Sequence, residues 1–221
     1  AGVTHIDVDT LDDQRCAVIN NHLKVKGVEI SALGYYPNPL DPDPARRNFY
    51  VSHIRKVIDA SALLGINRIN TFVGRDKNKS VEENFEIFQE VWKPVIQYAE
   101  TKGVKVGIEN CPMLFTADEW PGGNNLATTP AIWRRMFNMI PSASFGLNYD
   151  PSHLLWQQMD YVRPLYEFRE KIFHVHFKDA KVYTDKLDEV GIMATPLEFH
   201  SPKLPGLGDI EWGRFISALN D

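Results

Sequence analysis

The stretch VKVGIE (residues 104–109) alternates apolar side chains with polar or small ones. Side chains alternate across a β-strand, so the even positions share one face and Lys105, Gly107 and Glu109 share the other. A strand covered on both faces, as in a doubly wound sheet, would be apolar throughout. In a closed barrel the apolar face meets the outer helices and the other face points to the axis. The stretch therefore favours a barrel.

Two further stretches, FGLNYD (145–150) and IFHVHFK (172–178), repeat this alternation. Their predicted outer faces consist of Phe145, Leu147, Tyr149, Phe173, Val175 and Phe177. Their predicted inner faces consist of Gly146, Asn148, Asp150, His174, His176 and Lys178. Three strands with one apolar and one polar face each indicate the same barrel.

Strand-like runs and helical patterns alternate along the whole chain, which predicts a parallel sheet. Strands are predicted at residues 27–36, 66–74, 104–110, 144–150 and 172–179. Helices are predicted at 48–65, at 81–103 behind a Ser80–Glu83 capping box, from Pro130, at about 161–170 and near the end of 204–221. Pro94 predicts a kink or a junction of two helices. We expect one α/β domain over residues 1–221, a parallel (β/α)8 barrel.

The composition excludes several classes of protein. The chain is 43% hydrophobic with a net charge of −5, and its basic residues are dispersed, which argues against nucleic-acid binding. Two cysteines without a CxxC motif suit a reducing compartment. No apolar run is long enough for a membrane span, and the N-terminus lacks the pattern of a signal peptide. We expect a cytoplasmic protein without membrane or nucleic-acid partners.

Glu109, Asp150 and His176 each lie on an inner face at the C-terminal end of a predicted strand. The active sites of parallel barrels lie at that end. Two carboxylates and an imidazole converging there predict a divalent-metal site, with Mn²⁺ favoured and Mg²⁺, Co²⁺ or Zn²⁺ as alternatives. Taken alone, each of these residues could instead have an ordinary structural role, as a loop residue, a helix cap or a packed strand residue. His174, two residues deeper, is expected in the layer beneath.

Other polar residues are candidates for contact with a substrate. His153 follows Asp150 in DPSH and could bind a substrate oxygen or transfer a proton; alternatively, it caps a helix. Lys178 could hold an oxyanion or phosphate, or form a salt bridge to Asp179. Trp120, in the long loop 111–128, could cover a sugar ring or anchor the loop. Asn38, behind the first predicted strand, is a further substrate-binding candidate.

The motifs GIENCP, GLNYDPSHL, HVHFKDA and LPGLGDIEW occur in the order found in the xylose isomerase-like TIM barrels, the sugar phosphate isomerase/epimerase group, which the chain resembles over nearly its whole length. The resemblance implies a metal held by Glu109, Asp150 and His176, with His153 near the substrate. It also implies a fourth ligand, a glutamate on the eighth strand.

No residue here corresponds to that glutamate, and the first strand is also absent, so we expect a fragment of a barrel. Glu198 and Glu211, in a loop and at a helix start, are poor substitutes. Exposed strand edges would favour a homo-oligomer. Because one of two proton-exchanging glutamates is missing, we expect little epimerase activity from these 221 residues.

The leading functional hypothesis is a metal-dependent isomerase or epimerase that acts on a sugar, sugar phosphate or related polyol ketone through an enediolate. Glu109 would move the proton, and His153 and Lys178 would hold oxygens. A lyase or dehydratase acting on a keto-sugar or keto-inositol would use the same residues, and a metal-free binding or scaffold barrel is the non-enzymatic alternative. An abasic-site endonuclease needs more metal ligands and a basic face, and neither is evident.

Overall fold

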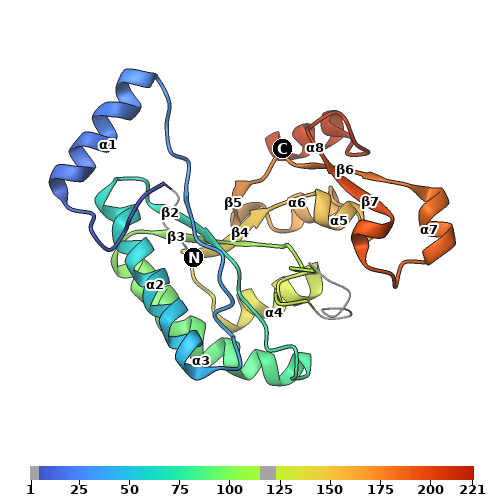
Figure 1. Cartoon of the computed structure of the whole chain (residues 1–221), viewed down its shortest axis with the longest axis horizontal. Helices are drawn as coiled ribbons and strands as arrows, with labels where there is room; N and C mark the ends of the chain where they lie inside the picture. Colours follow the sequence, from blue (N-terminus) through green and yellow to red (C-terminus); the bar gives the residue numbers. More distant parts are fainter. Residues whose placement is uncertain (1–4, 115–122) are drawn as a thin grey trace.

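The computed structural model describes residues 5–114 and 123–221. Five parallel strands form one sheet in sequential order (Figure 1). They are β1 (Leu33–Gly34), β2 (Arg68–Thr71), β3 (Lys105–Glu109), β4 (Phe145–Tyr149) and β5 (Ile172–Val175). The predicted parallel α/β fold is therefore confirmed, with strands shorter than the sequence patterns, above all at β1.

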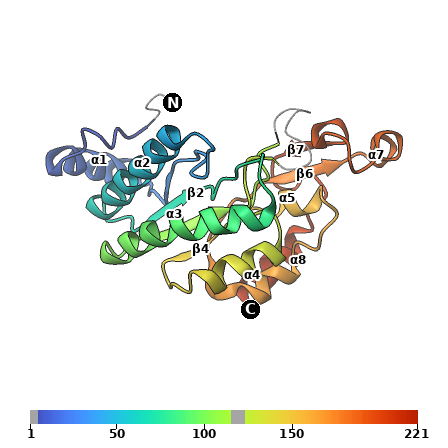
Figure 2. The same cartoon turned by 90° about the horizontal axis from the view of Figure 1, so that it is seen from below.

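Helices precede, connect and follow the strands. The main ones are α1 (Asp13–Lys26), α2 (Pro44–Leu63), α3 (Val81–Thr101), α4 (Pro130–Met139) and α8 (Trp212–Asn220). Helices α2 and α3 pack against the sheet and lie side by side along it in both views (Figures 1 and 2). Ser80 and Glu83 form the predicted capping box, and α3 runs as one helix through Pro94.

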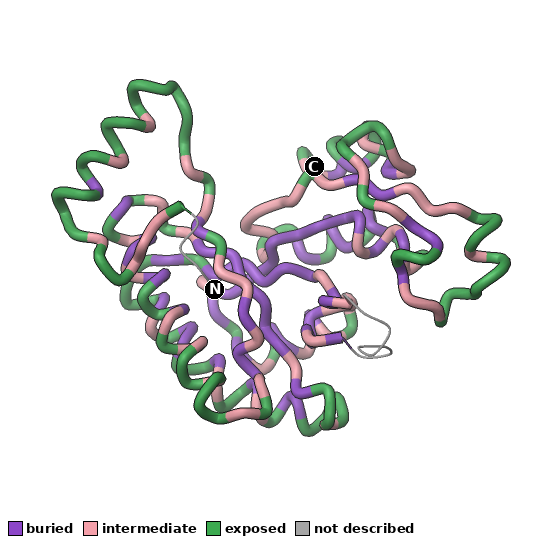
Figure 3. Tube along the Cα trace, viewed as in Figure 1, coloured by how far each residue is buried: buried purple, intermediate pink, exposed green. Residues whose placement is uncertain are grey.

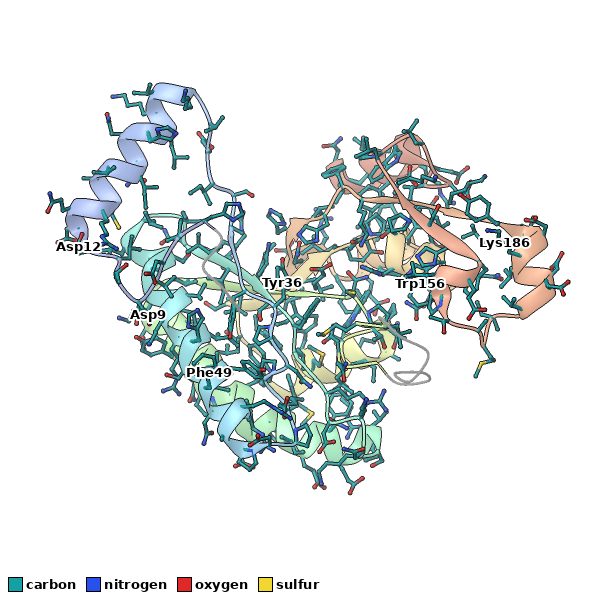
Figure 4. All side chains as sticks on the ribbon, viewed as in Figure 1. Asp9, Asp12, Tyr36, Phe49, Trp156 and Lys186 are labelled. Atoms are coloured by element: carbon teal, nitrogen blue, oxygen red, sulfur yellow. The ribbon has the colours of Figure 1, made fainter. Side chains whose placement is uncertain are left out.

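The shorter helices depart further from the patterns. The helix expected at 161–170 is split into α6 (Arg163–Glu167) and a 3-10 turn, η2 (Arg169–Lys171). A short helix, α5 (Ser152–Leu155), follows β4 directly and carries His153. Asp12 caps α1, where its carboxylate accepts the backbone N–H of Arg15, and Figure 4 labels it at the start of that helix.

The core lies between the sheet and these helices, as the alternation predicts. Val106, Ile108 and Leu147 are fully buried against helix residues such as Trp92 and Trp133. Figure 3 shows the central strands buried and α1 largely exposed. The inner faces of β3 and β4 carry small or polar side chains instead, which leaves the ends of these strands available for a site.

The alternation predicted for β5 is interrupted by a β-bulge. Leu147 pairs with Ile172, but Asn148 pairs with His174, so Phe173 is an extra residue. The ring of Phe173 lies beside Gly146 on the inner face and under the ammonium of Lys105. The prediction that Phe173 faces outward is therefore wrong, while His174 keeps its inner position.

The sheet is an incomplete barrel within the described residues, because β1 and β5 pair only with β2 and β4. Across the open side, Ser31 Oγ lies 3.0 Å from His174 Nε2, and His174 Nδ1 lies 2.9 Å from Asn148 Oδ1. His174 thus belongs to a polar layer beneath the strand ends. No helix of the described residues is both long and apolar enough to cross a membrane.

Beyond β5 the chain forms an antiparallel ladder of β6 (Asp179–Val182) and β7 (His200–Lys203), which the sequence patterns do not predict. Between them lie α7 (Thr184–Val190) and a 3-10 turn, η3 (Pro196–Glu198). This excursion projects from the sheet in Figure 1.

Asp179 fastens this excursion to the returning chain. The fully buried carboxylate accepts hydrogen bonds from four backbone N–H groups and from the indole of Trp212, at 2.8–3.1 Å. The backbone donors are those of Ala180, Gly206, Gly208 and Ile210. Burial opposes ionisation of Asp179, but these donors outweigh it and lower its pKa.

We predict that Gly146→Ala destabilises the fold by about 2–3 kcal/mol, because extra atoms in a tight contact cost energy. A Cβ here would lie 2.2 Å from the backbone oxygen of Lys171 and 2.6 Å from the ring of Phe173. Urea denaturation measures the change. Gly213→Ala in α8 is the control, since its Cβ meets nothing within 4 Å. Equal stability of the two variants would contradict the close packing around the bulge.

We also predict that Asp179→Asn lowers the free energy of unfolding at pH 7 by about 3 kcal/mol, since an amide group leaves buried N–H donors unpaired. The pKa of Asp179 is lowered in the folded chain, so its stabilisation is complete above the unfolded value of about 4 and is lost below it. The difference between wild type and variant should therefore shrink as the pH falls below about 4. Asp188→Asn, exposed on α7, should change little.

Candidate metal centre

The register of the sheet brings three polar residues to one edge. Glu109, the last residue of β3, pairs with Asn148 on β4, and Asp150 follows β4 directly. The N–H of His176, just after β5, donates to the carbonyl of Tyr149 at 2.9 Å. Each of these three residues thus ends a neighbouring parallel strand, so their side chains meet at the C-terminal edge.

The donor atoms of Glu109, Asp150 and His176 all lie within 4.8 Å of one another. Nδ1 of His176 is 3.4 Å from Oε1 of Glu109. His153 on α5 joins the cluster, with Nε2 3.8 Å from Glu109 Oε1 and 3.4 Å from Asp150 Oδ2. The sequence predicts that these four side chains lie near one another. In the structure they come together from the ends of three strands and from a short helix.

Asp150 is the most buried member of the cluster, with no exposed area. Its Oδ1 accepts the backbone N–H and the hydroxyl of Ser152 at 2.9 and 2.6 Å, which starts helix α5. Its backbone N–H and carbonyl are clamped by the side chain of Asn110 at 2.7 and 2.9 Å. These contacts fix the carboxylate and aim its other oxygen, Oδ2, into the cluster.

Oδ2 of Asp150 is buried and accepts no hydrogen bond of ordinary geometry from residues 5–114 and 123–221. The ammonium of Lys178 stands 2.9 Å away as an ion pair and lies equally close to His153 Nε2. Lys178 therefore contacts the cluster, while Asp179 takes the separate contacts described above. A buried carboxylate oxygen near a second carboxylate and an imidazole fits a divalent cation, because such mixed oxygen and nitrogen donors suit these ions.

The electrostatics of the cluster favour an ionised base beside a protonated imidazole. Burial opposes the charge on Glu109, but hydrogen bonds from His153 and His176 outweigh it and lower the pKa of Glu109 to about 2. Burial likewise opposes the charge on His153, but Cys111, Glu109 and Asp150 raise the pKa of His153 to about 9. Near neutral pH, Glu109 can accept a proton and His153 can donate a hydrogen bond.

One predicted substrate-binding residue, Asn38, is not brought into this cluster. Asn38 links the loops behind β1 and β2, because its amide nitrogen donates to the carbonyl of Arg75 and its oxygen accepts the N–H groups of Leu40 and Arg75. Its amide oxygen is thus engaged by backbone, and contact with a substrate stays a prediction. Trp120 lies outside the described residues.

Sequence reasoning missed three residues at the site. Tyr36, near the centre of Figure 4, approaches Asn148 with its hydroxyl 3.5 Å from Nδ2. Burial and the charge of Glu109 raise the pKa of Tyr36. Asn148 Nδ2 lies 3.1 Å from His176 Nε2, and Cys111 lies next to Glu109 and His153. The alternation that selected Glu109 also places Asn148 inward, whereas nothing in the sequence alone marks Cys111.

The other glutamates considered for the missing ligand lie elsewhere. Glu198 closes a capping box with Thr195 in η3, and Glu211 precedes α8 with its side chain 67% exposed beside Arg214. Among the described residues, neither belongs to a group of potential metal ligands around Asp150.

Solved structures share this fold. D-psicose 3-epimerase with D-tagatose, from Clostridium cellulolyticum H10, superposes with a TM-score of 0.70 at 16% identity, over 97% of this chain and 68% of that one. The IOLI protein with a binding zinc atom gives a TM-score of 0.67 at 17% identity, over 96% and 69%. At these identities the comparison shows the fold alone.

Sequence comparison adds a relative and a family. "Uncharacterized protein YfiH" of Bacillus subtilis (strain 168) is 24% identical over 204 residues, which cover 80% of this chain and 61% of that protein. The chain thus spans less than two thirds of the relative's length. The family described as "Xylose isomerase-like TIM barrel" matches residues 1–221. With its parallel strands and the match over its whole length, the chain belongs to the xylose isomerase-like TIM barrel family.

Proposed function

We propose that this chain carries the metal-binding and proton-transfer residues of a divalent-metal-dependent isomerase or epimerase acting on a sugar, a sugar phosphate or a related polyol ketone. The observation that carries the proposal is the convergence of Glu109, Asp150 and His176 around the buried Oδ2 of Asp150, which accepts no ordinary hydrogen bond from the described part of the chain. Mn²⁺ is the metal we favour.

The metal would be held by Glu109, Asp150 and His176, and when bound it would polarise neighbouring carbonyl and hydroxyl oxygens of the substrate. Glu109, with a pKa of about 2, is ionised and can take a proton from a carbon next to a carbonyl. His153, with a pKa of about 9, can hold the substrate oxygen on which negative charge develops.

The position of Lys178 between the cluster and the solvent supports the proposal. Its side chain is 37% exposed, so the ammonium can contact both Asp150 and a ligand entering from outside. A flexible ammonium is suited to a hydroxyl, oxyanion or phosphate of the substrate. The described residues offer Glu109 as the only glutamate in the cluster, so exchange by two glutamates needs a carboxylate from elsewhere in the protein or from a partner subunit.

We predict that Asp150→Asn lowers the affinity for Mn²⁺ by more than tenfold, since even outer-shell partners of a metal typically change its affinity by about 10–100-fold. A neutral amide oxygen is a poorer ligand than a carboxylate. Isothermal titration calorimetry measures the affinity, with the exposed Asp185→Asn on α7 as the matched control. Unchanged Mn²⁺ affinity in Asp150→Asn would mean that this carboxylate is purely structural.

The function itself is tested with a panel of aldoses, ketoses, their phosphates and keto-glycosides in D₂O with Mn²⁺. We expect NMR to show deuterium replacing a proton next to a carbonyl, with little epimerised product, because Glu109 acts alone. Glu109→Gln should abolish the exchange, and the control His22→Ala, exposed on α1, should retain it.

Other outcomes of this experiment favour other functions. A product that has lost water or a glycosidic substituent would assign the site to elimination, the lyase or dehydratase alternative. Absence of both Mn²⁺ binding and exchange would favour a metal-free binding barrel.

A further inference from the structure

Cys111 gives the site a second set of metal donors. One donor atom each from Glu109, Cys111 and His153 lies within 4.8 Å of the other two, a grouping as close as that of Glu109, Asp150 and His176. The two sets share Glu109 and differ in chemistry, because the set with Cys111 contains a sulfur donor and the set with Asp150 has only oxygen and nitrogen donors.

The thiol is held in place by its surroundings. Asn125 donates its amide N–H groups to the carbonyls of Glu109 and Cys111 at 2.9 and 2.6 Å, which fixes the chain between them. Asn110 clamps the backbone of Asp150, so the residue before Cys111 is fixed as well. Cys111 is partly exposed, and its sulfur lies within 4.8 Å of a ring nitrogen of His153 and an oxygen of Glu109, so the group is accessible and already assembled.

Sulfur changes which ions the site prefers. Thiolate and imidazole favour soft or borderline ions such as Zn²⁺ and Cd²⁺, whereas carboxylates suit Mg²⁺ and Mn²⁺. Zn²⁺ takes tetrahedral sets of sulfur, nitrogen and oxygen ligands, and three protein donors with one open position form a frequent arrangement. Glu109, Cys111 and His153 supply one donor of each kind.

We propose that Glu109, Cys111 and His153 form a second, thiophilic metal site that binds Zn²⁺ or Cd²⁺ in place of the ion held by Glu109, Asp150 and His176. The inference rests on the proposed function only through the shared Glu109. Binding of Zn²⁺ deprotonates the Cys111 thiol and the imidazolium of His153, forms a metal–sulfur and a metal–nitrogen bond, and releases both protons to solvent.

The two sites exclude each other. Two divalent ions would bring four positive charges to a cluster in which Glu109, Asp150 and a Cys111 thiolate supply three negative ones and Lys178 adds a further positive one. A thiophilic ion would also take Glu109 and His153 away from the substrate. The second site would therefore inhibit the proposed activity and set the metal selectivity of the protein.

The experiment compares wild type with Cys111→Ser, and uses Cys16→Ser as the control because Cys16 is the other cysteine and lies buried on α1. Reduced, metal-free protein is titrated with Cd²⁺ while the ultraviolet sulfur-to-cadmium charge-transfer band is followed. Calorimetry then gives the affinities for Cd²⁺, Zn²⁺ and Mn²⁺.

We expect the charge-transfer band in wild type and Cys16→Ser but not in Cys111→Ser. The affinity of Cys111→Ser for Cd²⁺ and Zn²⁺ should fall about tenfold or more, and that for Mn²⁺ should stay within about twofold. In wild type, Zn²⁺ should displace Mn²⁺ at a total stoichiometry of one ion and protect Cys111 from alkylation, a readout that needs no variant to fold.

A wild-type protein without the band, or one whose Cys111 is alkylated equally fast with and without Zn²⁺, would overturn the second site while leaving Mn²⁺ binding intact. The opposite result, a Cd²⁺–sulfur band without any Mn²⁺ binding, would support the second site and reject the proposed function. The two proposals therefore fail separately.

Discussion

A carboxylate without access to water has to be neutralised, and Asp150 imposes this requirement at the C-terminal edge of the sheet. One of its oxygens is satisfied by Ser152, which starts α5 and so positions His153. The other oxygen forms an ion pair with the ammonium of Lys178, which follows β5 in the chain. Because Asn110 at the end of β3 clamps its backbone, this single residue connects three strand ends and the short helix.

Asp179 meets the same requirement in a different way. Five N–H donors surround its carboxylate, so its charge is satisfied without a cation, and the effect is to hold the loop before α8 against β6. Lys178 and Asp179 are neighbours in the sequence, yet one reaches the site and the other stabilises the excursion. The two carboxylates therefore differ in their hydrogen-bond donors. Asp179 has a full set and is structural, whereas Oδ2 of Asp150 accepts no hydrogen bond of ordinary geometry from the described residues.

The inner face of the sheet shows how the fold supports the site. Small residues allow close contact, as where Gly146 accepts the ring of Phe173, and polar residues form a layer from Ser31 through His174 to Asn148. Asn148 then contacts His176 above it. The bulge at Phe173 restores the inward direction of His174 and His176, so an irregularity in the strand is what lets both histidines face the axis.

The sequence by itself determined the parallel α/β architecture and the convergence of Glu109, Asp150 and His176, because alternation along a strand and the shared direction of parallel strands are local properties. Only the tertiary structure decided the bulge at Phe173, the pairing of Lys178 with Asp150, the backbone contacts of Asn38 and the approach of Cys111 to His153. These depend on which segments meet across the fold and how their atoms fill the space between them, and no local pattern records either.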